Sequence, residues 1–270
     1  MAKRRLDTLL VDRGLAPDRE KAQALVMAGQ VSVGERPAPK PGTLVDEGAP
    51  LRVAERARYV GRGGEKLEHV LDAFGLDVRG LVAVDIGAST GGFTDCLLQG
   101  GAGRVYAIDV GKGQLDYRLR TDPRVAVMEG VNARNLEALA EPVDLVTMDV
   151  SFISLRAVLP AARRLFEGGR RGERPFAPTM KSGTIVALFK PQFEARKDEV
   201  PRGGVIRDPQ LHSIVIGRFV AWCVKNGFRV VDMTSSPILG AEGNREFFFW
   251  LRSDLSRSAR RSGAGDEGFP

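Results

Sequence analysis

Residues 81–110 read LVAVDIGASTGGFTDCLLQGGAGRVYAIDV, and this stretch decides the fold. An apolar run at its start predicts a strand, and the glycine-rich turn at 87–92 lets the backbone approach a ligand closely. Apolar residues at helical spacing predict a helix from Phe93 to a Gly-Gly pair, and a second strand then ends at Asp109. Strand, turn, helix and strand in this order form half of a nucleotide-binding α/β unit.

The turn and two acids beside it indicate which ligand the unit binds. Backbone N–H groups at the start of the helix bind polar ligand atoms, and Asp109 stands where an acid accepts hydrogen bonds from a ribose diol. The turn lacks the Gly-x-Gly-x-x-Gly pattern of dinucleotide sites, and Asp85 before it would repel a pyrophosphate. An acid there suits a ligand with a cationic amino-acid end, which favours S-adenosylmethionine over NAD. The alternative is a glycine-rich turn that only packs an α/β core.

Composition limits the possible classes of function. The chain has 270 residues, of which 43% are hydrophobic, so it is globular and has room for one α/β domain and a smaller one. The net charge is +6, and residues 1–60 hold more Lys and Arg than Asp and Glu, which favours a nucleic-acid partner. Cys96 and Cys223 lie far apart, so we expect no disulfide and no metal site, and both thiols belong to the core. We find no signal peptide and no membrane-spanning stretch, and therefore expect a cytoplasmic protein without a membrane partner.

The N-terminal residues 1–57 predict a small α+β domain. Amphipathic helices are expected at 4–15 and 18–28, and short strands at 31–33 and 51–53 enclose a Pro- and Gly-rich loop. The stretch from Arg5, RLDTLLVDRGLAPDREKAQALVMAGQVSVGERPAPKPGTLV, resembles the S4 RNA-binding domain.

The S4 resemblance implies that this domain presents basic side chains to structured RNA. Contacts of this kind go to phosphates, so they give affinity and position rather than sequence choice. For any one of these side chains, a solvated charged surface is an equally good interpretation. The candidates for contact with RNA are Arg4, Arg5, Arg13, Arg19, Lys21, Arg58 and Arg62.

A basic, glycine-rich joint at 58–64 is expected to link the small domain to the larger one and to become ordered on RNA. The larger domain is expected at 65–252, with a disordered tail at 253–270. Its first helix begins near Glu65 and carries Lys66 in the first turn, where the helix dipole disfavours a cation. Lys66 is therefore either a functional residue or an ordinary surface lysine.

Polar residues follow the later strands of the predicted sheet. Asp149 directly follows one strand, Lys190 follows another, and Asn132 lies in a loop where it would meet an adenine edge. The carboxyl ends of parallel strands line the ligand crevice, so these residues are expected to meet there. A mobile loop is expected at 167–182 and a loop over the site at 196–208. The expected strands are 123–127, 143–148, 183–189, 228–233 and 246–251, and the expected helices are 155–166 and 209–226. The residues expected to contact the cofactor are Asp85, Gly87, Ala88, Ser89, Gly91, Gly92, Phe93, Asp109, Val110, Asn132 and Asp149.

Four phrases of the sequence resemble the TlyA (hemolysin A) family, namely DIGASTGGF at 85–93, MDVSFIS at 148–154, FKPQFE at 189–194 and GNREF at 243–247. That family joins an S4 domain to an FtsJ-like ribosomal RNA 2′-O-methyltransferase domain of the Rossmann-like class I type, which uses S-adenosylmethionine. The resemblance implies methylation of cytidine ribose in 16S or 23S ribosomal RNA, or in both. It also implies a catalytic tetrad, carried over to Lys66, Asp149, Lys190 and Glu246. The loop at 167–182 is longer than the family's compact connection.

These four residue types suit transfer of a methyl group to a ribose hydroxyl. Lys190 is the expected general base for the hydroxyl proton. Lys66 and Asp149 are expected to orient the hydroxyl and the base, and Glu246 to hold a lysine by a charge-assisted hydrogen bond. Methylation of a base nitrogen usually needs an aromatic clamp such as Asn-Pro-Pro-Tyr, and methylation of a base carbon needs a nucleophilic cysteine. The chain has neither in the expected place.

Other functions were weighed against this one. A non-catalytic RNA-binding factor for ribosome assembly can retain a methyltransferase fold, although all four tetrad positions are intact. A pore-forming hemolysin would need an amphipathic pore segment or a spanning helix, and an NAD-dependent enzyme a different turn. The residues do not identify the target nucleotide, the ribosomal subunit or the oligomeric state.

Overall fold

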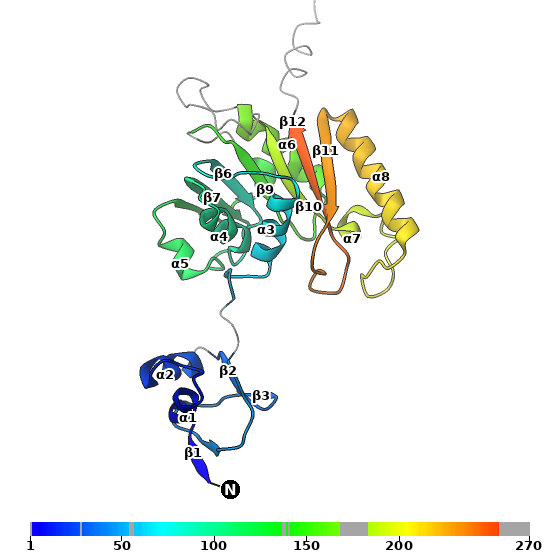
Figure 1. The fold of residues 1–270 in the computed structure, drawn as a ribbon. Helices are drawn as coiled ribbons and strands as arrows, with labels where there is room; N and C mark the ends of the chain where they lie inside the picture. Colours follow the sequence, from blue (N-terminus) through cyan, green and yellow to red (C-terminus); the bar gives the residue numbers. More distant parts are fainter. Residues whose placement is uncertain are drawn as a thin grey trace, which may run out of the picture. The chain divides into compact units, whose positions relative to one another are not determined.

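A computed structural model of the chain describes residues 2–27, 29–53, 57–136, 139, 141–167 and 183–253. The chain forms two compact units, Met1–Arg58 and Tyr59–Pro270 (Figure 1). Residues 168–182 of the expected mobile loop and residues 254–270 of the expected tail lie outside the described residues.

The stretch expected to be a flexible joint belongs to the second unit from Tyr59 onward, which corrects the expectation. Tyr59 is buried in the core of that unit, and helix α3 already begins at Gly63. A β-carbon on Gly64 would come within 2.2 Å of the Tyr59 ring. Gly64 therefore permits close packing, although its residue type suggested flexibility.

The first unit packs two short helices beside small antiparallel sheets. Strand β2 pairs with β3 and β5, and β1 pairs with β4. The first helix begins at Leu6, later than expected, because the residues before it pair with β4. Leu6, Leu10 and Val26 are among the buried side chains that form the core of the unit. The elements are β1 (Lys3–Arg5), α1 (Leu6–Asp12), α2 (Arg19–Met27), β2 (Val31–Val33), β3 (Arg36–Pro37), β4 (Leu44–Asp46) and β5 (Leu51–Val53).

The described residues of the second unit form a seven-stranded sheet in the order β11-β12-β10-β9-β6-β7-β8. Strands β6 to β10 are parallel to one another, and β12 runs antiparallel to its neighbours β10 and β11. The strands are β6 (Val82–Ile86), β7 (Arg104–Asp109), β8 (Val125–Glu129), β9 (Leu145–Met148), β10 (Thr184–Phe189), β11 (Phe228–Ser235) and β12 (Phe247–Ser253). The helices are α3 (Gly63–Ala73), α4 (Gly92–Gln99), α5 (Tyr117–Arg120), η1 (Ala133–Asn135), α6 (Leu155–Glu167), α7 (Pro191–Glu194) and α8 (Pro209–Lys225).

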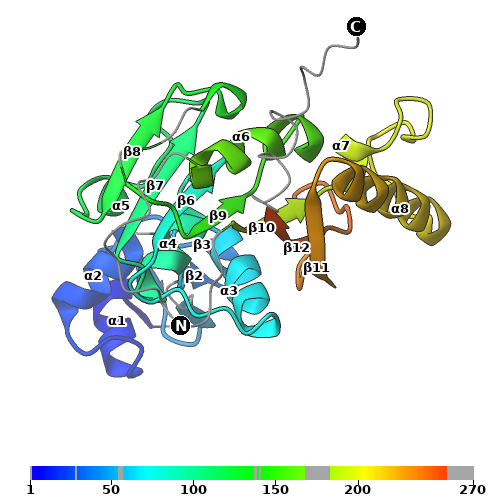
Figure 2. The same ribbon diagram turned by 90° about the horizontal axis from the view of Figure 1, so that it is seen from above.

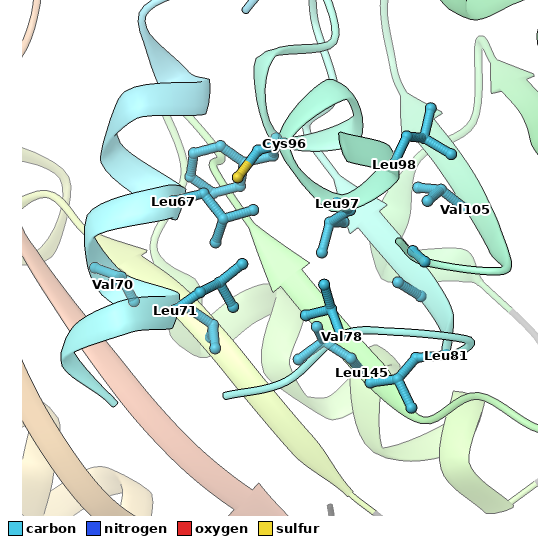
Figure 3. Packing of buried hydrophobic residues seen from close by; sticks show 14 of the residues in the cluster. Leu67, Val70, Leu71, Val78, Leu81, Cys96, Leu97, Leu98, Val105 and Leu145 are labelled. Atoms are coloured by element: carbon cyan, nitrogen blue, oxygen red, sulfur yellow. The ribbon is translucent and has the colours of Figure 1, made fainter. Parts of the chain in front are cut away.

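Both faces of this sheet are covered by helices, as expected for a doubly wound α/β fold (Figure 2). Successive strand residues alternate between two cores: Ala83 packs with α3 and α4, and Val84 packs with α6 and α8. Figure 3 shows Leu67 of α3 and Leu97 of α4 in the first of these cores. The sequence prediction of a small α+β unit, followed along the chain by a Rossmann-like domain, is thereby confirmed in its architecture.

Several boundaries differ from the sequence prediction. Strands β8 and β9 begin two residues later than expected, and Ser253 still belongs to β12 rather than to a tail. The short helices α5, η1 and α7 were not expected, since one turn leaves too few residues for a periodic pattern. Among the described residues, no helix has the length and apolarity needed to cross a bilayer.

One edge of the sheet collects the polar residues that follow the strands. The register pairs Ala187 of β10 with Met148 of β9, and Phe189 of β10 with Phe247 of β12. Asp149 directly follows Met148, Lys190 directly follows Phe189, and Glu246 directly precedes Phe247. Because β12 is antiparallel, its first residue lies at the edge where the parallel strands end.

Candidate active site

The turn between β6 and α4 is closed by glycines at positions that do not accept a side chain. Gly87 has a φ of +86°, and a β-carbon on it would lie 2.4 Å from the carbonyl oxygen of Asp149. Gly91 has a φ of +99°, and a β-carbon there would lie 2.2 Å from a methyl carbon of Leu119. The turn therefore lies directly against the end of β9, where Asp149 stands.

A cavity of about 490 Å³ opens at the carboxyl ends of β6, β7 and β9. Of the residues expected to contact a cofactor, Gly87, Ser89, Asp109, Val110, Asn132 and Asp149 line it. A second cavity of about 120 Å³ also touches Gly87, Ser89 and Asp149, so the two are neighbours. Its further lining includes the expected residues Ala88, Gly92 and Phe93, together with Arg62.

Backbone N–H groups hold the carboxylate of Asp109 at the wall of the larger cavity. Its Oδ2 accepts from the Ser89 N–H at 2.8 Å, and its Oδ1 accepts from the Gly111 N–H at 2.7 Å. The side-chain oxygen of Asn132 accepts from the Arg134 N–H at 3.1 Å. Both side chains are thus fixed where a nucleoside would lie in a Rossmann-like site.

Three of the residues expected to contact the cofactor have other partners in the structure. Asp85 is fully buried and lines neither cavity, because Thr94 Oγ1 and Thr147 Oγ1 donate to its carboxylate at 2.7 Å and 3.1 Å. Burial raises the pKa of Asp85 to about 7. Gly91 also lines neither cavity, since it packs on Leu119. Phe93 reaches only the smaller of the two and is otherwise a core residue, stacked on Phe248 at 6.0 Å between ring centroids.

Lys66 and Glu246 form a buried ion pair. The Lys66 Nζ donates to Glu246 Oε2 at 2.5 Å, and the two side chains are only 10% and 4% exposed. Lys66 comes from the first turn of α3, and Glu246 directly precedes β12. Lys66 is therefore not a surface lysine, and its partner explains how a cation is held in that turn.

Lys190 forms the second ion pair of the site, with Asp149. The Lys190 Nζ lies 2.6 Å from Asp149 Oδ1, although the angle between them is not that of a hydrogen bond. The same Nζ donates a hydrogen bond to Ser151 Oγ at 2.8 Å. Lys190 follows β10 and Asp149 follows β9, two paired parallel strands. The four tetrad positions thus form two lysine–carboxylate pairs at one edge of the sheet.

Sequence reasoning missed side chains around these pairs. Ser151 binds Lys190, and Phe152 lines the larger cavity with a φ of +61° and an exposed fraction of 88%. Asn244, which is 1% exposed, accepts from the Ile206 N–H and donates to the Gly204 carbonyl, each at 3.0 Å. These residues stand in the quoted phrases MDVSFIS and GNREF, which were the signal available for them.

Known proteins match both units of the chain. The model of the FtsJ-like methyltransferase family matches residues 59–253, which include both ion pairs and both cavities. The chain belongs to the FtsJ-like methyltransferase family. The S4 domain model matches residues 4–51 of this FtsJ-like methyltransferase.

Curated and solved relatives place this FtsJ-like methyltransferase in the TlyA and hemolysin A group. The 16S/23S rRNA (cytidine-2′-O)-methyltransferase TlyA of Mycobacterium tuberculosis is 44% identical, over 98% of this chain and 96% of that protein. Hemolysin A of Brachyspira hyodysenteriae is 38% identical, over 90% of this chain and 97% of that one. A solved structure from Streptococcus thermophilus, described as a candidate hemolysin, has 39% identity and a TM-score of 0.67, and covers 97% of this chain and 94% of its own. The family resemblance inferred from the sequence is confirmed.

In the first unit of this FtsJ-like methyltransferase, several residues expected to contact RNA bind other residues of the same unit. Asp7 is fully buried, and Arg5 and Arg19 bind its carboxylate at 2.8 Å and 3.1 Å. These contacts, with the Arg5 hydrogen bond first, hold the pKa of Asp7 far below its usual range.

Two further arginines also have partners inside the first unit. Arg4 pairs with Asp12 at 3.1 Å, and Arg13 donates to the carbonyl groups of Ala49 and Glu47. Lys21 is an exposed cation on α2. The guanidinium groups are thus oriented by the fold, while their side chains remain partly exposed.

Proposed function

We propose that this FtsJ-like methyltransferase uses S-adenosylmethionine to methylate a ribose 2′-hydroxyl, with cytidine in ribosomal RNA as the expected substrate. The proposal is carried by the two ion pairs at one sheet edge, Lys66–Glu246 and Lys190–Asp149. Asp149 of the second pair lines the larger cavity. The named activity of the Mycobacterium tuberculosis relative points to the same reaction.

The residues of the cavity fit the proposed methyl donor. Asp109 offers a fixed carboxylate for the ribose diol, and Asn132 stands on the same wall for the adenine. Gly87 lies so close to the end of β9 that a side chain on it would meet the carbonyl oxygen of Asp149. S-adenosylmethionine supplies a methyl group on a sulfonium centre, and the chain has to align and activate the acceptor oxygen.

Lys190 is proposed as the general base for that oxygen, a role in which its neutral amine takes the hydroxyl proton as the bond to the methyl group forms. It reaches Asp149 and Ser151, which orient its amino group at the cavity wall. Asp149 Oδ1 lies 2.6 Å from the Lys190 Nζ, which suits this carboxylate to hold the amino group of the base in place. Lys66, held by Glu246, adds a fixed cation to orient the acceptor.

The target nucleotide is proposed to stack on Phe152. Its ring is 88% exposed at the cavity, beside the ring of Phe193 at 5.2 Å between centroids. Proteins that act on structured RNA commonly take an unpaired base onto an aromatic ring. A base held there would bring its ribose toward Asp149 and Lys190.

The first unit is proposed to bind RNA phosphates, and the protein is proposed to work in the cytoplasm on ribosomal subunits. Its match to the S4 domain and the oriented cations around Asp7 support an RNA partner. Phosphate contacts of this type bring the substrate to the enzyme without selecting the methylated atom.

The test is methyl transfer from labelled S-adenosylmethionine to 30S and 50S ribosomal subunits from cells that lack the protein. Wild type is compared with Lys190→Ala and with Lys225→Ala, which removes an exposed lysine at the end of α8. We expect label on a ribose 2′-oxygen, a loss of about 10²–10⁴-fold in rate for Lys190→Ala, and no change for Lys225→Ala.

Two results would refute the proposal. Label on a base would be compatible with the methyltransferase fold but would contradict the proposed transfer to a ribose hydroxyl by the tetrad. Absence of transfer to both subunits, with S-adenosylmethionine and RNA still bound, would favour the non-catalytic assembly factor. Mapping the labelled nucleotide also decides whether cytidine is the target.

A further inference from the structure

We propose that Glu194 is a positioning residue that fixes the loop after β9 against the turn after β10. The loop is residues 149–154, here called the Asp149 loop, and the turn is residues 190–194, here called the Lys190 turn. This inference rests on the proposed function, because it assigns Glu194 the task of holding Lys190 in place for methyl transfer.

The carboxylate of Glu194 is enclosed and bonded on both oxygens. Its Oε1 accepts from the Leu155 N–H at 2.5 Å, and its Oε2 accepts from the Ser154 hydroxyl at 2.7 Å. Arg156 Nε lies 3.6 Å from the same Oε2. The side chain is 1% exposed, so these groups replace the water that the carboxylate has lost.

The contacts of Glu194 form one end of a row of contacts between the Asp149 loop and the Lys190 turn. At the other end Lys190 binds Asp149 and Ser151, at 2.6 Å and 2.8 Å. Between the ends the rings of Phe152 and Phe193 meet at 5.2 Å. The Asp149 loop is therefore attached to the Lys190 turn at its start, middle and end.

The Asp149 loop needs such an attachment because its backbone is strained. Phe152 has a φ of +61°, a conformation that a bulky residue adopts only when its surroundings hold it there. Ser154 and Leu155, which Glu194 binds, immediately follow this strained segment and begin α6. Glu194 thus anchors the loop at the point where it enters the helix.

A carboxylate is the appropriate group for this position. The start of α6 carries unpaired N–H groups and the positive end of the helix dipole, which favour an anion. Burial raises the pKa of Glu194, while the bonds from Ser154 and Leu155 oppose that rise. Glutamine can still accept from the Leu155 N–H and donate to the Ser154 oxygen, so it is the conservative replacement, whereas alanine removes both bonds.

The experiment measures kcat and KM for Glu194→Ala, Glu194→Gln and Ser154→Ala. The control Asp77→Asn removes a carboxylate before β6, outside both segments, that pairs with Arg79 at 2.6 Å. We expect kcat to fall about 10²-fold for Glu194→Ala, since a displacement of about 1 Å can have that effect, with KM values nearly unchanged. Glu194→Gln is expected to recover most of the rate, Ser154→Ala to lie between, and Asp77→Asn to equal wild type.

A second readout separates positioning from general destabilisation. Acetic anhydride labelling followed by mass spectrometry reports the accessibility of Lys190 and Lys66, whose side chains are 11% and 10% exposed. Loss of Glu194 is expected to raise labelling of Lys190 alone, since only the Lys190 turn loses its attachment. A merely structural role would raise labelling of both lysines together.

The outcomes distinguish this inference from the proposed function. If wild type does not methylate a ribose, the proposed function fails, and the labelling pattern still decides whether Glu194 positions Lys190. If wild type is active and Glu194→Ala keeps its kcat, or if Lys190 and Lys66 become labelled together, the inference is overturned. If Glu194→Ala does not fold, Ser154→Ala decides instead, and wild-type kcat and Lys190 labelling in that variant overturn it.

Discussion

Lys66 and Glu246 hold opposite charges in a place nearly closed to water, with 2.5 Å between their charged atoms. Removing one partner leaves the other charge buried without compensation. We predict that Lys66→Met lowers the free energy of unfolding by about 3–5 kcal/mol. The double variant with Glu246→Leu is expected to recover most of this loss, because no unpaired charge remains. Urea unfolding of both variants measures the difference.

The same two variants separate stability from activity. If the pair serves the reaction, the double variant should unfold like wild type and still fail to transfer methyl groups. A double variant as unstable as Lys66→Met would contradict the account of the buried charge. A stable double variant with wild-type activity would show that neither residue is catalytic.

Asp85 gives the second unit a stability that depends on pH. Burial raises the pKa of its carboxyl group to about 7, the charge of Asp149 adds to the rise, and hydrogen bonds from Thr94 and Thr147 oppose it. Because an unfolded chain ionises this group near pH 4, the folded state retains the proton over a range where the unfolded state has lost it. The contribution is therefore full below about pH 4 and is lost as the pH rises to about 7.

We predict that Asp85→Asn removes this pH dependence. The stability of wild type relative to the variant should decline by a few kcal/mol, on the order of 1.4 for each unit of pKa, between pH 4 and pH 8. It should then remain constant at higher pH. Denaturant unfolding at a series of pH values measures it, and a difference that stays constant across the whole range would contradict the raised pKa.

At this scale the sequence pointed to the four proposed tetrad residues but not to their pairing. Lys66 and Glu246 are 180 residues apart, and only the folded chain brings them together. Asp85 was expected to contact a ligand because an acid at the end of a strand suggests one. Two threonine hydroxyls enclose it instead, and no local pattern predicts that they meet it.

Among the elements, α3 shows why glycine can be misinterpreted. Gly63 and Gly64 suggested a flexible joint, yet they begin the helix, and Gly64 packs directly against Tyr59. Glycine provides both flexibility and close approach, and sequence alone does not separate the two roles. Longer elements were predicted well, since β10 and α8 have the uninterrupted apolar runs and helical stripes that mark them.

We predict opposite effects for alanine at two helical glycines. A β-carbon at Gly64 would lie 2.2 Å from the Tyr59 ring, so Gly64→Ala should destabilise the protein by about 1–3 kcal/mol, typical of overpacking. Gly217 in α8 is exposed with nothing within 4 Å of such a carbon, so Gly217→Ala should stabilise it by about 1 kcal/mol. Thermal unfolding compares them, and a Gly64→Ala variant as stable as wild type or more so would contradict the packing role of Gly64.

For the whole molecule, the order of strands along the chain indicated the fold class but not the arrangement of the sheet. Strand β12 lies between β10 and β11 in the sheet. It follows β11 along the chain, yet β11 is the edge strand and β12 lies inside the sheet. That pairing depends on contacts between segments far apart in the sequence, which local periodicity does not encode. The two units were anticipated because the S4-like and FtsJ-like motifs occupy separate parts of the chain.

The division into two units predicts separate effects on RNA binding and on chemistry. Lys21 is an exposed cation of the first unit, whereas Arg13 donates to the carbonyl groups of Ala49 and Glu47 within that unit. Lys21→Ala should raise KM for the ribosomal subunit, leave kcat unchanged, and reduce the slope of log affinity against log salt by about 0.7–0.9, the loss of one phosphate contact. Arg13→Ala should instead lower stability by about 1 kcal/mol, because it removes hydrogen bonds. Methyl-transfer kinetics at several salt concentrations measure the first effect, and a lower kcat for Lys21→Ala at saturating RNA would mean that the first unit also takes part in the chemical step.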